Sequence, residues 1–266
     1  MTILKINNLN YSRDDTIIFS NLNLNVFKKD YISIIGLNRS GKTTLTKLLC
    51  AIIPTDNIFS INDISLNKQT VLDYIEHIGV VSNSLNVFLT KKVKDELILP
   101  LKNLGYNELK INYYLNKIVK FFEIEDMLTK NITSLTNIEK AKLQIIIALI
   151  HEPSILILDD AFTELDNKTT EFMLNKLKIL NEKGLTIINI TTDLSTIYNS
   201  NDIYLLNDTK LEKLGNVTDT FEQDNYLRSL GFEIPFVVDL AIKLKFYGLL
   251  DKIYYDLNLL EDNLWN

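Results

Sequence analysis

One stretch of this sequence combines two glycines, a lysine and a hydroxyl residue at a spacing that suits phosphate binding. Residues 36–43 read Gly-Leu-Asn-Arg-Ser-Gly-Lys-Thr and match the pattern G-x-x-x-x-G-K-[ST]. The glycines let the backbone curl so that its N–H groups point at phosphate oxygens, and a helix that starts near Gly41 adds its positive end. Lys42 can reach the β- and γ-phosphates, and the Thr43 hydroxyl can bind Mg²⁺. The residues predicted to contact the nucleotide are Gly36, Leu37, Asn38, Arg39, Ser40, Gly41, Lys42, Thr43 and Thr44.

A second stretch places two acidic residues at the end of an apolar run. Residues 155–166, ILILDDAFTELD, lead four apolar residues into Asp159 and Asp160. A carboxylate at such a strand end is placed to hold Mg²⁺, so Asp159 is predicted as a metal ligand, with a polar strand-end cap as the alternative. Asp160 is the candidate catalytic residue that positions the attacking water. The protein therefore either splits a nucleotide or only holds one.

The elements that position these residues alternate buried strands with helices. The strands are predicted at 31–36, 154–160 and 185–191, and the helices at 41–52 and 169–184. This alternation indicates an α/β fold with a parallel core sheet. Because the glycine-rich loop follows a predicted strand and opens a predicted helix, the context argues against a chance glycine loop.

The first of these helices shows a clear apolar face. Within 41–52 we expect Leu45, Leu48, Leu49 and Ile52 to lie on one side and to pack on the sheet.

The remaining segments define the predicted organisation of the chain. Residues 3–12 and 17–27 alternate apolar and polar side chains, which predicts an N-terminal antiparallel sheet. We expect a nucleotide-binding domain over 1–220, with a helical insertion at about 84–150 between the first and second buried strands. A terminal hairpin is predicted near 207–208. Residues 221–266 are predicted to form a C-terminal helical extension that serves as a dimer contact.

Composition limits the classes of function. The chain has 266 residues, 46% of them apolar, and a formal net charge of -6, which makes nucleic acid a poor partner. A single cysteine, Cys50, fits a reducing compartment. No apolar run approaches the roughly 20 residues that a membrane span needs, and the N-terminus lacks the pattern of a signal peptide. We therefore expect a cytoplasmic protein that reaches a membrane only through a partner.

The order of these pieces resembles the nucleotide-binding subunit of ABC transporters over about the first 220 residues. The resemblance lies in GLNRSGKTT, in SLTNIEKAKLQIIIALIHEPSILILDDAFTELD and in TIINITTDL. In the family, the matching stretches are the phosphate loop, a signature, a helix, a magnesium-binding strand, a loop at the dimer contact and a switch strand. The resemblance implies ATP and Mg²⁺ as cofactors. Tyr11 lies where the family places an aromatic that stacks on adenine, although its spacing fits a packed strand tyrosine equally well.

The C-terminal segment resembles the ATPase subunits of energy-coupling factor (ECF) transporters. The similar stretches are residues 93–106, VKDELILPLKNLGY, and residues 227–249, LRSLGFEIPFVVDLAIKLKFYGL. Without the resemblance, the second stretch simply predicts a helix that packs on the body of the protein or on a partner. The resemblance implies a second ABC ATPase subunit, identical or different, and a transmembrane coupling subunit docked near 82–100. It also implies membrane substrate-binding subunits and a peripheral location on the cytoplasmic face of the cell membrane.

Three single positions depart from the family pattern around the γ-phosphate. Asp160 stands where the family usually has glutamate, and a misplacement of about 1 Å can cost on the order of a hundredfold in rate. Thr192 replaces the switch histidine and is a candidate catalytic residue, with a helix N-cap shared with Asp193 as the favoured alternative. Ser82 replaces a glutamine that senses magnesium, and its short side chain is the weakest metal candidate.

The signature departs as well. Thr136 keeps a hydroxyl, but Asn137 and Ile138 replace two glycines, and a β-branched residue disfavours left-handed backbone angles. Thr136 and Glu139 instead match a capping box ahead of a long apolar helix. Arg39 lies where the family often has glycine, either as a further cation near the phosphates or, as we favour, as a surface arginine.

The sequence therefore predicts an ATP-binding subunit of an ECF-type importer that energises uptake of vitamins or other micronutrients. Its degenerate sites are expected to bind MgATP and to hydrolyse it slowly or not at all. One alternative is a non-catalytic scaffold or regulatory pseudo-ATPase. Another is a soluble ABC ATPase outside transport, and an ordinary active transporter ATPase also stays open.

Overall fold

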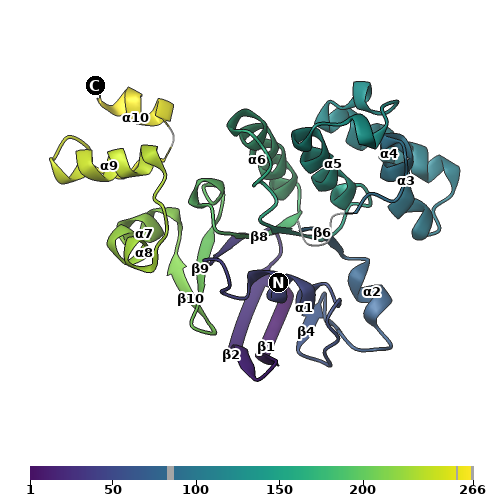
Figure 1. Ribbon diagram of the computed structural model, residues 1–266, viewed down its shortest axis with the longest axis horizontal. Coiled ribbons are helices and arrows are strands. Elements are labelled where there is room, and N and C mark those ends of the chain that lie inside the picture. Colours follow the sequence, from purple (N-terminus) through teal and green to yellow (C-terminus); the bar gives the residue numbers. More distant parts are fainter. Residues whose placement is uncertain (83–86, 256, 265–266) are drawn as a thin grey trace.

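The computed structural model describes residues 1–82, 87–255 and 257–264. The predicted start of the helical insertion and part of the predicted docking region at 82–100 therefore lie outside the described residues. Figure 1 shows a central pair of sheets, with a helical group on one side and the C-terminal helices on the other.

The first sheet is antiparallel and has the strand order β2-β1-β4-β5. Its strands are β1 (Thr2–Arg13), β2 (Thr16–Phe27), β4 (Phe59–Ile61) and β5 (Ile64–Ser65). The long β1–β2 pair confirms the antiparallel sheet that the alternating N-terminal pattern predicts. The short strands β4 and β5, which were not predicted, extend this sheet from a segment after the first helix.

The second sheet has the order β10-β9-β3-β8-β7-β6. Its strands are β3 (Tyr31–Ile35), β6 (Ile78–Ser82), β7 (Ile155–Asp159), β8 (Thr186–Thr191), β9 (Asp202–Asn207) and β10 (Lys210–Gly215). The first five run parallel to their neighbours, and only β10 pairs antiparallel, with β9. The parallel core sheet and the terminal hairpin are thus confirmed, and the hairpin turn lies at Asp208 and Thr209.

Strand β6 was not predicted. It lies ahead of the predicted helical insertion, which does fall between the first and second buried strands as predicted, and it pairs with β7. A glycine inside a short strand weakens the strand signal. Gly79 has a packing reason, because a Cβ atom there would lie 2.2 Å from the carbonyl oxygen of Ala148 on α5 (Asn137–Leu149).

The other helices follow the expected helical segments, except α2, which was not predicted. They are α1 (Lys42–Leu49), α2 (Val71–Ile75), α3 (Val93–Asn103), α4 (Glu108–Phe122), α6 (Asn167–Glu182), α7 (Val217–Glu222), α8 (Asp224–Leu230), α9 (Phe236–Phe246) and α10 (Leu257–Leu264). Within α1, Leu45, Leu48 and Leu49 are fully buried, as predicted. Ile52 was predicted wrongly: the helix ends at Leu49, Ala51 takes a left-handed conformation, and the Ile52 side chain is 50% exposed.

Each face of the parallel sheet is covered by its own layer. Along β7, Ile155 and Ile157 join the core shared with α1 and the antiparallel sheet, whereas Leu156 and Leu158 join the core formed by α3 to α6. A third core joins α7 to α10 with residues such as Ile203 of β9. Among the described residues, no helix is both long enough and apolar enough to span a membrane.

Candidate nucleotide site

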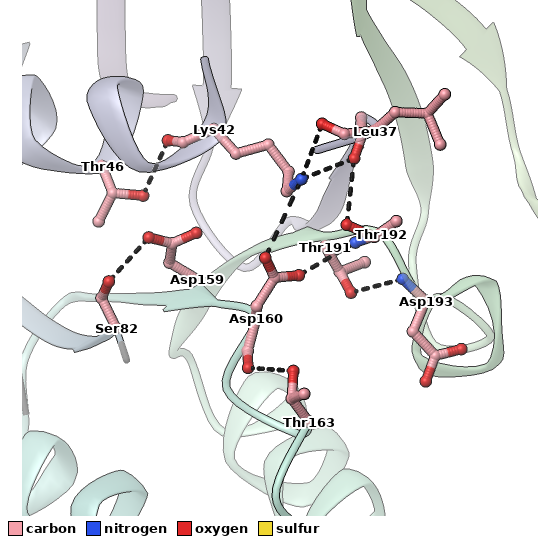
Figure 2. Close-up of polar contacts among 11 residues, drawn as sticks. Leu37, Lys42, Thr46, Ser82, Asp159, Asp160, Thr163, Thr191, Thr192 and Asp193 are labelled. Atoms are coloured by element: carbon pink, nitrogen blue, oxygen red, sulfur yellow. Dashed lines mark hydrogen bonds and ion pairs between the residues drawn. The ribbon is translucent and has the colours of Figure 1, made fainter. Parts of the chain in front are cut away.

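Three neighbouring parallel strands end at the same edge of the sheet and bring the predicted site residues together. β3 leads into the loop 36–41, β7 ends at Asp159 next to Asp160, and β8 ends beside Thr192. Figure 2 shows these side chains gathered around Lys42. Ligands of open α/β sheets bind outside the carboxyl ends of the strands, so this edge is the expected position for a nucleotide.

The loop requires both of its glycines. A Cβ atom on Gly36 would lie 2.5 Å from the Ser40 hydroxyl oxygen and 3.1 Å from the Leu206 carbonyl oxygen. Gly41 has a φ of 104°, and a Cβ atom there would lie 3.0 Å from the Phe19 ring. The helix α1 starts directly after Gly41 without any side-chain cap, so its first N–H groups are free to meet an anion.

Lys42 is held at the centre of the loop and is only 5% exposed. Its Nζ donates hydrogen bonds to the carbonyl oxygens of Gly36 at 2.7 Å and Leu37 at 3.1 Å, and lies 4.0 Å from Asp160 Oδ2. Burial lowers the pKa of Lys42, while the carboxylates of Asp160 and Asp159 oppose that shift. The ammonium is therefore placed where a phosphate would replace loop carbonyls as its partner.

Asp159 has the surroundings of a metal ligand. It is 2% exposed, and the Ser82 hydroxyl donates to its Oδ2 at 2.8 Å. Its Oδ1 is buried without a hydrogen-bond partner. Burial raises the pKa of Asp159, and the hydroxyls of Ser82, Thr43 and Thr46 oppose that rise. An unpartnered buried carboxylate oxygen beside hydroxyl groups fits Mg²⁺, which prefers oxygen ligands.

The described side chains near Asp159 do not by themselves form a complete set of metal ligands. Within the described ranges, no group of three or more His, Cys, Asp and Glu side chains gathers to hold a metal ion. Mg²⁺ is usually bound by one or two carboxylates together with substrate phosphates. The donor set of Asp159 and Thr43 therefore fits Mg²⁺ that arrives with a nucleotide.

Asp160 and Thr192 lie together at the loop. The Thr192 N–H donates to Asp160 Oδ1 at 3.1 Å, and the Thr192 hydroxyl donates to the Gly36 carbonyl oxygen at 3.3 Å. The N-cap alternative for Thr192 is thus carried by Asp193 alone, whose carboxylate accepts the Ser195 N–H at 2.8 Å. Both predicted catalytic residues face the phosphate loop (Figure 2).

A buried polar network that includes Asn189 of the strand β8 was not predicted. Asn189 of β8 donates to the Thr196 hydroxyl oxygen at 3.1 Å and to the Ser33 hydroxyl oxygen at 3.4 Å. The Thr196 hydroxyl in turn donates to the Asp193 carbonyl oxygen at 2.8 Å. The network ties the segment after Thr192 to the centre of the sheet. An asparagine inside the apolar run IINIT is the sequence signal that could have revealed it.

The signature segment forms a capped helix start. Thr136 and Glu139 form the predicted capping box: the Glu139 N–H donates to the Thr136 hydroxyl oxygen at 3.1 Å, and the Thr136 N–H donates to Glu139 Oε2 at 2.9 Å. Lys130 adds a salt bridge to Glu139 at 2.8 Å. Asn137 and Ile138 are the first residues of α5, and neither takes a left-handed backbone conformation.

The remaining predicted residues surround the loop at different depths. Tyr11 is half-buried and is paired across the antiparallel sheet with Phe19, whose ring lies against Gly41. Arg39 is exposed and takes a φ of 70°, a conformation that glycine adopts more readily. The Ser40 hydroxyl is buried without a partner. The predicted residues that are half-buried or exposed are Leu37, Asn38, Thr43 and Thr44.

The fold and this site define a P-loop nucleotide-binding protein. The family model for ABC transporters matches residues 19–163. The chain is 30% identical over 240 residues to the energy-coupling factor transporter ATP-binding protein EcfA of Pediococcus pentosaceus, a match that covers 88% of this chain and 86% of the relative. It is 29% identical over 255 residues to EcfA1 of Streptococcus thermophilus, covering 94% and 92%.

Solved structures share the fold. CbiO1 of Clostridium perfringens, part of the transporter complex CbiONQ, is 23% identical with a TM-score of 0.75 and covers 88% of this chain and 96% of its own. A dimeric ATP-binding cassette bound to ADP and Pi is 24% identical with a TM-score of 0.69, covering 80% and 99%. The chain belongs to the ABC transporter family, among the ATP-binding proteins of the energy-coupling factor type.

Proposed function

We propose that this chain is an ATP-binding subunit of an ECF-type importer that binds MgATP and hydrolyses it slowly or not at all. The observation that carries the proposal is the contrast within one site. Lys42 is buried at the loop and Asp159 keeps an unpartnered oxygen, whereas aspartate, threonine and serine replace the family groups at positions 160, 192 and 82.

The binding half of the site supports nucleotide affinity. The first N–H groups of α1 are uncapped, and the Lys42 ammonium can exchange the loop carbonyls for phosphate oxygens. Asp159 and Thr43 would hold Mg²⁺, which when bound neutralises charge that develops on the phosphates.

The chemical half of the site supports slow turnover. The Asp160 carboxylate already accepts the Thr192 N–H at 3.1 Å and lies 4.0 Å from the Lys42 ammonium, so both of its oxygens face protein groups at the loop. Its side chain is one methylene shorter than glutamate. Thr192 uses its hydroxyl on the Gly36 carbonyl oxygen and cannot become a cation as histidine does.

The partners follow from the family. We propose a dimer with a second ABC ATPase subunit, a transmembrane coupling subunit docked near 82–100 and membrane substrate-binding subunits for vitamins or other micronutrients. These place the chain at the cytoplasmic face of the membrane. Phe236, Phe246 and Tyr247 of the C-terminal helices are strongly exposed, which supports the proposed use of the extension (221–266) as a dimer contact.

The binding claim is tested by calorimetry on the purified chain. We expect saturable binding of MgATP, and Lys42→Ala should weaken it by roughly tenfold to a hundredfold because charge-assisted bonds to phosphate are lost. Lys47→Ala, in the last turn of the same helix, is the matched control and should leave binding unchanged. No heat of binding in the folded chain would favour the scaffold alternative instead.

The transport claim is tested by identifying the proteins that co-purify with the chain. Co-purification from membranes with integral membrane subunits and a second ATPase supports an importer. A chain recovered only in the soluble fraction, without such subunits, would favour the alternative of a soluble ABC ATPase.

A further inference from the structure

A cavity of about 380 Å³ lies away from the nucleotide site. Its walls come from three places: α4, the segment that joins α5 to β7, and the segment that joins α6 to β8. These elements lie next to one another on one side of the sheet (Figure 1). The volume falls in the range of about 300 to 1,000 Å³ that is usual for small-molecule sites.

The position of the cavity relates it to the nucleotide site. Ser154 and Leu185, which line the cavity, come directly before β7 and β8, whose opposite ends lead to Asp159 and Thr192. At a rise of about 3.3 Å per residue, β7 spans roughly 13 Å between the two sites. Leu149, the last residue of α5, also lines the cavity, and the same helix begins at the signature. One ligand here would touch the far ends of the two strands that lead to Asp159 and Thr192, and the far end of the helix that begins at the signature.

The walls are apolar with cations at the edge. Phe121 and Phe122 line the cavity together with aliphatic residues such as Leu180. The polar and charged residues of the lining are Tyr114, Lys117, Glu152, Ser154 and Lys183. The cavity therefore offers an apolar interior and a charged edge, which is how specific small-molecule sites are built.

The two lysines differ in their partners. Lys117 is paired with Glu152, which also lines the cavity. Lys183 makes no salt bridge to any residue in the described ranges, and its Nζ lies 5.6 Å from the centroid of the Phe121 ring. Lys183 is exposed, so an ammonium without a salt bridge lies beside an apolar wall.

We propose that this cavity binds a small amphipathic anion. Its apolar, ring-containing body packs against Phe121 and Leu180, and its single negative group pairs with Lys183. A neutral apolar ligand would cover the Lys183 ammonium without satisfying it, and a cation would be repelled by it. The anion satisfies both the apolar interior and the charged edge. The site differs from the phosphate loop in position, in lining residues and in ligand chemistry.

Occupation of the cavity is coupled to the nucleotide site. A ligand that changes how α4 and α5 lie against β7 and β8 changes the geometry at the other ends of those elements. Because coupling between two sites is reciprocal, bound MgATP must then change the affinity of the cavity for its ligand by the same factor. This second step rests on the proposed nucleotide binding, whereas the cavity itself does not.

The test uses 8-anilinonaphthalene-1-sulfonate, an aromatic monoanion whose fluorescence rises in apolar surroundings, on the full chain without nucleotide. We expect one saturable site. Lys183→Gln should raise its Kd by roughly tenfold, since a charge-assisted contact is lost. Leu180→Trp should fill the cavity and abolish binding in a protein whose circular dichroism is unchanged. Lys178→Gln, an exposed lysine of the same helix, and Phe246→Ser, in the exposed C-terminal aromatic group, should leave Kd within about twofold because neither residue lines the cavity.

Three outcomes would overturn parts of the proposal. Absence of saturable binding would rule out the site. So would a Kd in the Lys183→Gln and Leu180→Trp variants equal to that of the unaltered chain. Loss of binding in Phe246→Ser would reassign the probe to the C-terminal surface. An equal Kd with and without saturating MgATP would remove the coupling alone. Failure of MgATP to bind, measured by calorimetry without the probe, is a separate result that concerns only the proposed function.

Discussion

The phosphate loop and the signature segment each lead into a helix, but they satisfy the first N–H groups of that helix differently. Before α1, Gly41 provides no side-chain cap, so those N–H groups are left for an anion. Before α5, Thr136 and Glu139 form a capping box. An uncapped helix start can bind phosphate, whereas a start that is capped by its own side chains no longer needs one.

The two segments also differ in backbone strain. The loop has positive φ angles at Arg39 and Gly41, and the one at Arg39 is unfavourable for a residue with a side chain unless the surroundings hold it. Asn137 and Ile138 have no such conformation and simply continue the helix. The loop is thus built for a ligand, and the signature segment is built for stability. The following predictions test that contrast, from the largest expected effect to the smallest.

The largest effect is expected from restoring chemistry on the loop side. Asp160→Glu combined with Thr192→His should raise ATP turnover of the assembled transporter by on the order of a hundredfold, because a carboxylate misplaced by about 1 Å is corrected. Turnover is measured by phosphate release at saturating MgATP. Unchanged turnover in a double variant that still binds ATP would show that the base and the switch residue are not what limits hydrolysis.

The second prediction breaks the loop itself. Gly41→Ala places a side chain at a φ of 104° and 3.0 Å from the Phe19 ring, so MgATP affinity should fall by roughly tenfold or more. Calorimetry gives the affinity, and urea denaturation checks the fold. Gly105→Ala is the matched control, since Gly105 has a φ of 71° with no neighbouring atom within 4 Å of the added Cβ. If both variants bind MgATP equally well, crowding at Gly41 does not matter for the loop.

The third prediction concerns the signature. Thr136→Ala removes the capping hydroxyl and should lower the free energy of unfolding by about 1 kcal/mol, while MgATP affinity of the isolated chain stays the same. Thr136→Ser keeps the hydroxyl and should lower the free energy of unfolding much less. Urea denaturation and calorimetry are compared on the same samples. A fall in nucleotide affinity without loss of stability would mean that the segment still recognises phosphate within its own chain.

The smallest effect is expected at Ser82. Ser82→Ala removes the donor to Asp159 Oδ2, a contact of 2.8 Å, and should weaken MgATP binding by roughly fivefold, which corresponds to about 1 kcal/mol. Binding of ATP in excess EDTA should be unaffected, because the hydroxyl acts through the metal carboxylate. An equal loss with and without Mg²⁺ would place Ser82 against the nucleotide and not beside the metal.

Much of the fold followed from local patterns. The alternating N-terminal strands, the loop before α1, the strand that ends at Asp159 and the capping box at Thr136 all involve residues close in sequence, whose spacing encodes their geometry. β6 escaped prediction because Gly79 makes its strand pattern weak. The glycine is needed because Ala148, on a helix some seventy residues away in the chain, leaves no room for a side chain.

The sequence by itself determined the family chemistry: which residues can bind phosphate, which strand end carries a carboxylate, and which family groups are replaced. Tertiary structure alone decided the partners of those residues. Ser82 meets Asp159 across 77 positions of sequence, and Thr192 meets Gly36 across 156. Asn189 reaches Ser33 in the same way. Such contacts depend on the order β3-β8-β7-β6 in the sheet, which no local spacing encodes, and the cavity between α4, α5 and α6 exists only once those helices have packed.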